Sequence, residues 1–275
     1  MAEAGVASRR QCEQLILDEF VRVNGKIVFE LPCFVDPQQD RIVIDGKRLG
    51  FENKVYFLLH KPKKVVCTNY DPSGRTRAVD LLGKVKERVF PVGRLDAETK
   101  GALIMTNDGD LANQLTHPSF GVPKTYLAQV HGTVSGEDIQ KLRKGIWMAE
   151  GKAQIENVKI AKRGKIYSYL EITLREGRNR QIRRMLSRIG HPIKELTRTH
   201  IGPISLRGLG PRNFRPLTDK EIASLKKLSQ PDTSRKSGPS AVKGKRPTAR
   251  KVTKPKPHRK SVKPKPMAAR AKRKR

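Results

Sequence analysis

The chain has 275 residues and a formal net charge of +33, which lies far outside the usual range and indicates a polyanionic partner. No apolar run approaches the roughly 20 residues that a transmembrane helix needs, and the N-terminus lacks the apolar core of a secretory signal. We therefore expect no membrane association and a reducing, cytoplasmic compartment. The three cysteines, Cys12, Cys33 and Cys67, are widely spaced, which argues against disulfide bonds and a zinc site.

The positive charge is concentrated towards the C-terminus. Residues 231–275 contain 18 Lys or Arg and one acid, a net charge of +17, which leaves +16 for the preceding 230 residues. This tail also contains seven prolines and no aromatic residue, a composition that predicts disorder in the free protein. The remaining body is basic in its own right and is long enough for two domains.

Residues 1–50 have the pattern of a small separate module. Ser8 and Gln11 fit a capping box at the start of a helix. Asn24-Gly25 and Asp45-Gly46 each follow a short apolar run, and such dipeptides predict hairpin turns.

Arg9 and Arg10 stand in the first turn of that helix, where the helix dipole disfavours each positive charge by about 0.5 kcal/mol. They belong either to a solvated charged face or to a surface that contacts phosphate groups and positions the module on a nucleic acid. We favour phosphate contacts, because these explain why the arginines are placed against the dipole.

A second domain is expected over residues 55–228, after a linker at 51–54. It opens with a buried strand at 55–59, which ends before Pro62. The patterns that follow predict, in chain order, a strand at 102–105, a helix at 107–115, an alternating strand at 124–130, a helix at 135–146, a hairpin over 155–160 and 167–174, and a helix at 182–189.

The loop before the strand at 102–105 centres on Asp96. Gly93 and Gly101 bound this loop and permit tight backbone geometry. Arg94 supplies a cation two residues before Asp96, which favours an ionised carboxylate. From these residues alone two interpretations stay open: Asp96 caps a turn that Thr99 closes, or its carboxylate is the reactive group of a site.

Two aromatic residues are singled out by position. Tyr126 shares one face of its alternating strand with Ala128 and Val130, and a lone strand tyrosine is more often a core residue than a catalytic one. Trp147 falls at the end of the helix predicted over 135–146, and we expect its side chain in the hydrophobic core.

The segment 175–186 is unusually rich in arginine. Arg180, Arg184 and Arg188 are spaced by four along the predicted helix, where like charges repel by a few tenths of a kcal/mol per pair. Contact with a phosphate backbone would remove that repulsion. Arg183 lies on the flank of the apolar stripe and is expected to project into a partly buried site. That stripe consists of Ile182, Met185, Leu186 and Ile189.

Three separated motifs resemble, in order, those of the RsuA/RluB-type ribosomal RNA pseudouridine synthases. They are Arg94-Leu95-Asp96, Lys124-Thr125-Tyr126 and the run EGRNRQIRRM at 176–185. The segment 4–26 is similar to the S4 RNA-binding domain that precedes many of these enzymes. The family usually has several more residues before Ala4, so the module is expected to be truncated at its N-terminus or the chain to start upstream.

The resemblance implies an α+β fold, in which a small S4-like RNA-binding module precedes a domain with a mixed, mainly antiparallel sheet flanked by helices. It implies isomerisation of a specific uridine to pseudouridine in ribosomal RNA, with a lean towards the large subunit, and neither metal nor cofactor. Asp96 would be the nucleophile, Tyr126 would stack on the flipped base, Arg183 would pair with Asp96, and Arg94 would fill the vacated space.

The expected partner is ribosomal RNA or a ribosome assembly intermediate, and we expect a monomer without an obligate protein partner. The alternative is a non-catalytic rRNA-binding or ribosome-assembly factor on the same fold. It explains the charge equally well but gives no reason for Asp96, Tyr126 and Arg183 to occur together. The predicted RNA contacts are Arg9, Arg10, Lys61, Arg94, Lys124, Arg180 and Arg184.

Overall fold

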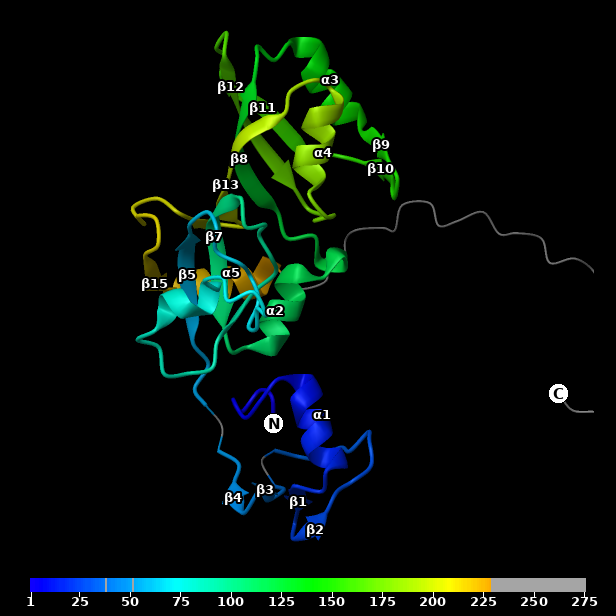
Figure 1. The fold of residues 1–275 in the computed structure, drawn as a ribbon, viewed down its shortest axis with the longest axis vertical. Coiled ribbons are helices and arrows are strands. Elements are labelled where there is room, and N and C mark those ends of the chain that lie inside the picture. Colours follow the sequence, from blue (N-terminus) through cyan, green and yellow to red (C-terminus); the bar gives the residue numbers. More distant parts are fainter. Residues whose placement is uncertain (38, 51, 229–275) are drawn as a thin grey trace, which may run out of the picture. The chain divides into compact units, whose positions relative to one another are not determined.

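The computed structural model of the chain describes residues 1–37, 39–50 and 52–228 (Figure 1). The basic tail at 231–275, predicted to be disordered, lies outside these residues. Within the described ranges, no helix combines the length and the apolar composition that a membrane span requires.

The N-terminal module is built as its turn signals predict. α1 (Arg9–Leu17) begins with the expected capping box, in which the Ser8 side chain accepts the N–H of Gln11 and the Gln11 side chain accepts the N–H of Ser8. The strands form an antiparallel sheet in the order β2-β1-β3-β4 and turn at the two Gly-containing dipeptides. They are β1 (Val21–Val23), β2 (Lys26–Ile27), β3 (Ile42–Ile44) and β4 (Lys47–Arg48).

The second part of the described chain contains a nine-stranded sheet with the order β11-β12-β8-β13-β7-β5-β15, and β6 and β14 pair with β7 and β13. β13 and β7 run parallel, and the other strand pairs described in this sheet are antiparallel. The predicted mixed, mainly antiparallel sheet is therefore confirmed. Its strands are β5 (Tyr56–Lys61), β6 (Phe90–Pro91), β7 (Thr99–Thr106), β8 (Lys124–His131), β11 (Asn157–Lys162), β12 (Tyr167–Leu174), β13 (Ile193–Ile201), β14 (Ile204–Ser205) and β15 (Phe214–Pro216).

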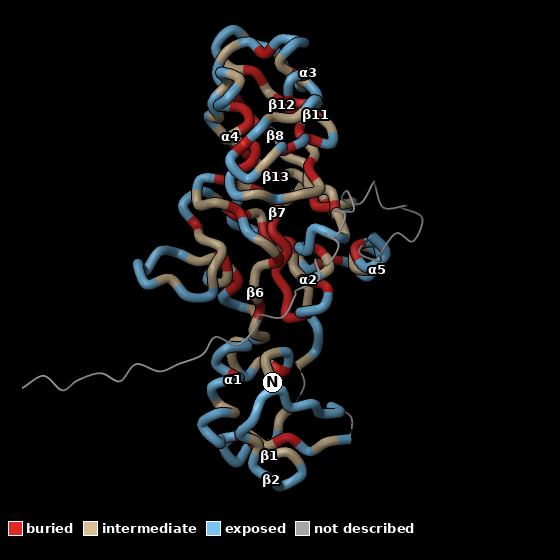
Figure 2. Tube along the Cα trace, turned by 90° about the vertical axis from the view of Figure 1, so that its right-hand side faces the viewer, coloured by how far each residue is buried: buried red, intermediate tan, exposed pale blue. Residues whose placement is uncertain are grey.

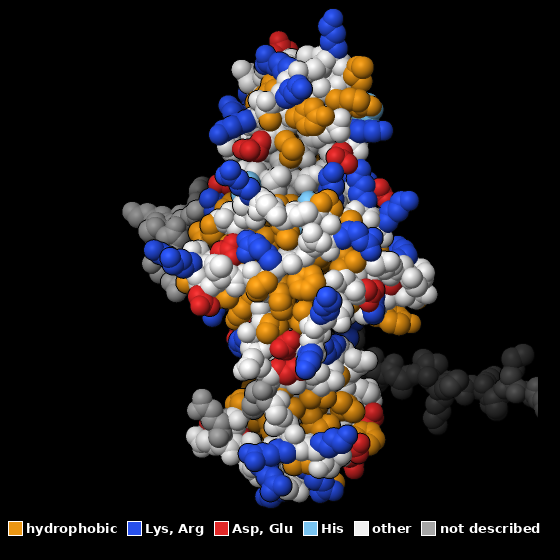
Figure 3. Space-filling view, turned by 90° about the vertical axis from the view of Figure 1, so that its left-hand side faces the viewer, with side chains coloured by type: hydrophobic (Ala, Val, Ile, Leu, Met, Phe, Trp, Pro, Cys, Tyr) orange, Lys and Arg blue, Asp and Glu red, His pale blue; other side chains and the backbone are white. Residues whose placement is uncertain are grey.

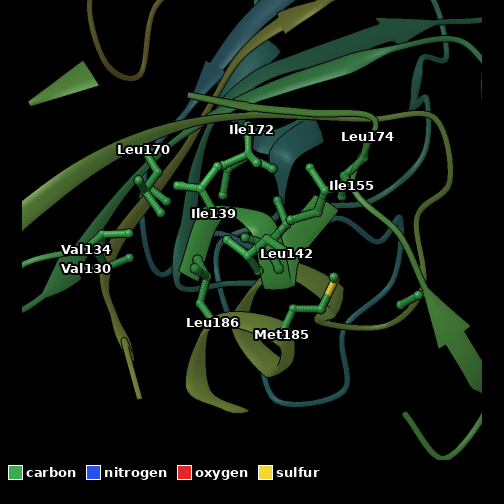
Figure 4. Close-up of a cluster of buried hydrophobic side chains, with 14 of the residues drawn as sticks. Val130, Val134, Ile139, Leu142, Ile155, Leu170, Ile172, Leu174, Met185 and Leu186 are labelled. Atoms are coloured by element: carbon green, nitrogen blue, oxygen red, sulfur yellow. The ribbon is translucent and has the colours of Figure 1, made fainter. Parts of the chain in front are cut away.

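Helices cover both halves of the sheet, with buried residues concentrated between the layers (Figures 1 and 2). Leu142 of α3 and Met185 and Leu186 of α4 pack with Leu170 and Ile172 of β12 in one core (Figure 4). A second core joins α2 and α5 to β5 and β7, and a third includes residues of the short helix η1. The helices are α2 (Gly109–Thr116), α3 (Gly136–Lys144), α4 (Gln181–Arg188) and α5 (Asp219–Leu228), with 3-10 turns η1 (Ala78–Leu82) and η2 (Pro118–Phe120).

The prediction for Trp147 is wrong. α3 stops at Gly145, whose φ of +86° ends the helix, and the chain continues as a two-stranded hairpin of β9 (Ile146–Met148) and β10 (Gly151–Ala153). Alternation along β9 directs Met148 into the core and Trp147 outward, and Trp147 is 69% exposed.

The start of α2 also differs from the prediction. Its N-cap is Asp108 rather than Asn107, because the Asp108 side chain accepts the N–H of Leu111. The Asn107 side chain instead accepts the N–H of Val55 and donates to the carbonyl of Asn53. Asn107 thereby fixes the entry of the chain into β5.

Candidate active site

A parallel pairing at the centre of the sheet brings the two informative loops together. β7 and β13 pair with Gly101 opposite Arg198, and parallel strands begin at the same edge of a sheet. The Asp96 loop, which precedes β7, therefore lies near α4, which precedes β13. Gly101 has a φ of +123°, and a Cβ there would lie 2.5 Å from the Arg198 nitrogen, so glycine is needed for this approach.

A cavity of about 320 Å³ opens where these segments meet. Its size falls in the range of pockets that bind small ligands. The three residues predicted to be catalytic and two of the predicted RNA contacts line it together: Arg94, Asp96, Tyr126, Arg180 and Arg183. Side chains from a loop, a strand and a helix start therefore converge on one space.

The Asp96 carboxylate faces a guanidinium group in this cavity. Its Oδ2 lies 3.6 Å from Nη1 of Arg180, and both side chains are partly exposed. The Asp96 carbonyl accepts the N–H of Thr99, so the turn that closes at Thr99 is present, but the backbone forms it. The side chain is left to the cavity and to Arg180.

Arg183 contacts the same loop in a different way from the expected ion pair. Its Nη2 donates to the Glu98 carbonyl at 3.2 Å and to the Thr99 hydroxyl at 3.3 Å. Burial, and then the neighbouring Arg180 charge, lower the pKa of Arg183, whereas the charges of Asp96 and Glu98 oppose that shift. In the described chain the recorded ion pair of Asp96 is with Arg180, and Arg183 holds the backbone beside Asp96.

The backbone at Arg180 explains why Arg180, and not Arg183, pairs with Asp96. Arg180 is the N-cap of α4 and has a φ of +48°, so it leaves the helical path and its side chain turns towards Asp96. The row of arginines that the spacing of Arg180, Arg184 and Arg188 predicts along the helix is therefore not formed. Arg184 instead pairs with Glu150 at 2.8 Å, and Arg188 donates to the Trp147 carbonyl.

Tyr126 lies where the alternation of β8 predicts. Its ring packs against the core cluster that contains Ala128 and Val130, and it also lines the cavity. The side chain is thus half-buried, with one part held by the core and another open to a bound group. An aromatic ring held in this way is suited to stacking on a nucleobase.

The predicted RNA contact at Lys61 does not fit its position. Lys61 is 0% exposed, and its Nζ donates to the carbonyls of Pro62 and Val65. Burial lowers the pKa of Lys61, while the nearby Cys67 and Asp96 oppose that shift. The side chain fixes the chain after β5 and adds positive potential beneath Asp96.

Lys124 is also committed to the protein. Its Nζ donates to the carbonyls of Leu115 and Val122. Burial, followed by the charge of Arg198, lowers the pKa of Lys124 to about 8. We therefore correct this prediction as well, because the ammonium ties β8 to the end of α2 instead of facing a phosphate.

Of the other predicted RNA contacts, Arg184 is partly buried and paired with Glu150, whereas the rest have the exposure that the role requires. Arg9, Arg10 and Arg94 are exposed. Lysine and arginine side chains are distributed over the face drawn in Figure 3, with acidic side chains between them. The contacts themselves stay predictions.

Arg198 is a buried residue that the sequence analysis did not single out. It is 2% exposed, and its Nε donates to the Ala102 carbonyl at 2.7 Å. It stands opposite Tyr126 on β8 and Gly101 on β7, so it supports the strands that carry the site. The period of two along β13 provides the signal, because Arg198 shares the inward face of Leu196.

Comparison of the sequence with known proteins identifies the family to which this site belongs. The profile described as RNA pseudouridylate synthase matches residues 55–188, and the S4 domain profile matches residues 1–28. Ribosomal large subunit pseudouridine synthase B of Bacillus subtilis is 42% identical over 231 residues, which is 83% of this chain and 94% of that protein. The chain belongs to the RNA pseudouridine synthase family.

A second related sequence and a solved structure support the assignment to this family. An uncharacterized RNA pseudouridine synthase of Aquifex aeolicus is 42% identical over 226 residues, 82% of this chain and 91% of that protein. A crystal structure of a pseudouridylate synthase matches with a TM-score of 0.58 and 28% identity, covering 82% of this chain and 96% of that chain. The predicted family, fold class and enzyme class, an isomerase, are confirmed.

Proposed function

We propose that this synthase converts a specific uridine of large-subunit ribosomal RNA to pseudouridine, with Asp96 as the reactive carboxylate. The observation that carries the proposal is the cavity in which Asp96 faces Arg180 beside Tyr126. The name of the Bacillus subtilis relative supports the large ribosomal subunit as the source of the substrate.

The target uridine must leave its helix stack before it can react, because C1′ and C6 are inaccessible in paired RNA. Base extrusion costs a few kcal/mol and needs a surface that replaces the lost stacking. Tyr126, held by the core on one side, supplies this surface in the cavity. Arg94, exposed at the cavity lining, fills the space that the base leaves.

The isomerisation exchanges one bond for another at the same sugar carbon. The C1′–N1 bond breaks and its electron pair leaves with the uracil. The uracil rotates in place, the C1′–C5 bond forms, the proton on C5 is lost, and N1 takes up a proton, so that no atom is gained or lost overall. Asp96 either attacks to form a covalent adduct and leaves again, or it assists departure of the uracil. A carboxylate suits the first route because it can bond to a glycosidic carbon reversibly.

The two arginines have separate tasks in this scheme. Arg180 stabilises the negative charge of Asp96 across 3.6 Å. Arg183 fixes the loop through Glu98 and Thr99, which keeps the carboxylate within reach of the substrate.

The RNA is bound by more than the cavity. We assign RNA positioning to an S4-like module over residues 1–50, through Arg9 and Arg10, and catalysis to a domain over residues 55–228. The substrate is ribosomal RNA or an assembly intermediate in the cytoplasm, and the enzyme acts as a monomer.

Site mapping of pseudouridine in ribosomal RNA tests the proposal. RNA from a strain that lacks the gene should have lost pseudouridine at one large-subunit position, and a plasmid copy should restore it. A complete set of pseudouridines in the deletion strain would contradict the proposal, and loss from the small subunit would contradict the assignment to the large subunit.

A further inference from the structure

Trp147 is an exposed aromatic residue on a structured element. It is the single tryptophan of the chain, the residue is 69% exposed, and it lies on the β9–β10 hairpin beside α4 (Figure 1). Tryptophan combines a large apolar body with a polar N–H and is enriched at binding interfaces. The protein contacts described at this residue involve its backbone, which pairs in the hairpin and accepts from Arg188.

The exposure is imposed by the fold. Met148 and Ala153 on the inner face of the hairpin belong to the core that α3 and α4 share with the sheet. Alternation then directs Trp147 and its cross-strand partner Lys152 to the solvent face. The indole is thus presented from a held backbone, which reduces the ordering cost of binding.

The hairpin is fastened to the wall of the catalytic cavity. Arg178, which lines that cavity, donates to the carbonyls of Glu150, Gly151 and Lys152. A second tie runs from α4, where Arg184 pairs with Glu150. The hairpin that carries Trp147 is therefore held by a residue of the cavity wall and by α4.

The charge around the indole fits a polyanion. Lys144, Lys152 and Arg188 are exposed on or next to the hairpin. The acid within the hairpin, Glu150, is neutralised by its pair with Arg184. An aromatic platform flanked by cations is the combination that binds single-stranded nucleic acid, because the ring stacks on a base while the cations contact phosphates.

We propose that Trp147 stacks on an unpaired nucleotide that flanks the target uridine, while Lys152 contacts the adjoining phosphate. This inference rests on the proposed function, since it takes RNA as the substrate. It assigns to the hairpin a contribution to RNA binding outside the catalytic cavity. A ribosomal protein as the partner of this surface is an outcome of the test.

Intrinsic fluorescence provides a direct test, because Trp147 is the only indole in the chain. Titrating the full-length protein with a short single-stranded oligouridylate should quench the emission. Heparin, which carries charge but no bases, should bind with little quenching. Equal quenching by both polyanions, or no response to RNA, would overturn the stacking.

Variants give a second readout that does not depend on fluorescence. Trp147→Ala should weaken oligouridylate binding about tenfold, within the range of one lost base–aromatic stack, whereas Trp147→Phe should retain most of the affinity. With an rRNA transcript tritiated at uridine C5, Trp147→Ala should raise KM and leave kcat unchanged. The matched control is Ile166→Ala, which removes another exposed apolar side chain of this domain and should change neither value.

The two proposals fail in different ways. If the wild type releases no tritium from rRNA transcripts, the proposed function is wrong, whatever the fluorescence shows. If the wild type is active but Trp147→Ala has unchanged affinity and KM, the stacking is wrong and the proposed function stands. Quenching of the Trp147 emission by a ribosomal protein, without any response to RNA, would likewise overturn the stacking.

Discussion

Asp96 Oδ2 and Arg180 Nη1 lie 3.6 Å apart, although one residue precedes β7 and the other precedes α4. Arg180 reaches this position with a left-handed backbone, φ +48°. Such a conformation costs a non-glycine residue on the order of 1 kcal/mol, and conformations of this kind gather at functional sites. The ion pair is partly exposed, so its contribution to stability is small.

Arg180→Gln should therefore lower kcat for pseudouridine formation, by about tenfold, because the Asp96 carboxylate loses the charge that fixes it. Unfolding by denaturant should be nearly unchanged, since a partly exposed ion pair contributes about 1 kcal/mol or less. Arg163→Gln, which removes an exposed arginine of the β11–β12 connection, is the control. Equal activity of the Arg180 variant and the control would show that the pair has no catalytic role.

Gly101→Ala should destabilise the domain by about 3 kcal/mol, through the disfavoured φ of +123° and the overlap with the Arg198 backbone. Chemical denaturation measures this loss. The matched control is Gly136→Ala in α3, where an added Cβ meets open space and alanine favours the helix by up to about 1 kcal/mol. A Gly101 variant as stable as the wild type would mean that β7 and β13 do not need this close approach.

Lys124 should leave a signature in the pH dependence of stability. Its pKa is lowered to about 8 in the folded protein, against about 10.4 for an unperturbed lysine. Between these values the unfolded chain binds the proton and the folded chain does not, so the free energy of unfolding rises with pH. Lys124→Met should remove that rise, whereas Lys159→Met, at an exposed lysine of β11, should keep it. An unchanged rise in the Lys124 variant would show that the lowered pKa of Lys124 is not the cause of the pH dependence.

Removal of residues 231–275 should weaken RNA binding and flatten its dependence on salt, because the tail carries a net charge of +17 and each neutralised phosphate steepens the salt slope. Affinities measured over a series of salt concentrations give the slope. A chain in which glutamine replaces the lysines and arginines of the tail should behave like the deletion. The same slope in all three proteins would mean that the tail does not contact the RNA.

Local signals in the sequence were sufficient for much of the fold. The Ser8–Gln11 capping box and the alternation around Tyr126 depend on neighbours within a few residues, and both are present in the structure. The resemblance to the synthase family placed Asp96, Tyr126 and Arg183 in one site, and all three line one cavity.

The errors come from contacts that only the tertiary fold creates. Lys61 resembles other basic residues in sequence, but the packing of β5 buries it completely. The partner of Asp96 depends on the left-handed backbone of Arg180, which the residue types around it do not encode. Trp147 was placed in the core because the end of α3 at Gly145 was not recognised. The chain continues from there as a strand, whose alternation turns Trp147 outward.

The most direct test of the account is tritium release from rRNA transcripts by Asp96→Asn, compared with the wild type under single-turnover conditions. The amide keeps the size of the side chain but cannot act as the carboxylate, so the rate should fall by a factor of at least roughly 10³, with RNA affinity largely retained. An Asp96→Asn protein that modifies RNA at the wild-type rate would contradict the central role given to this residue.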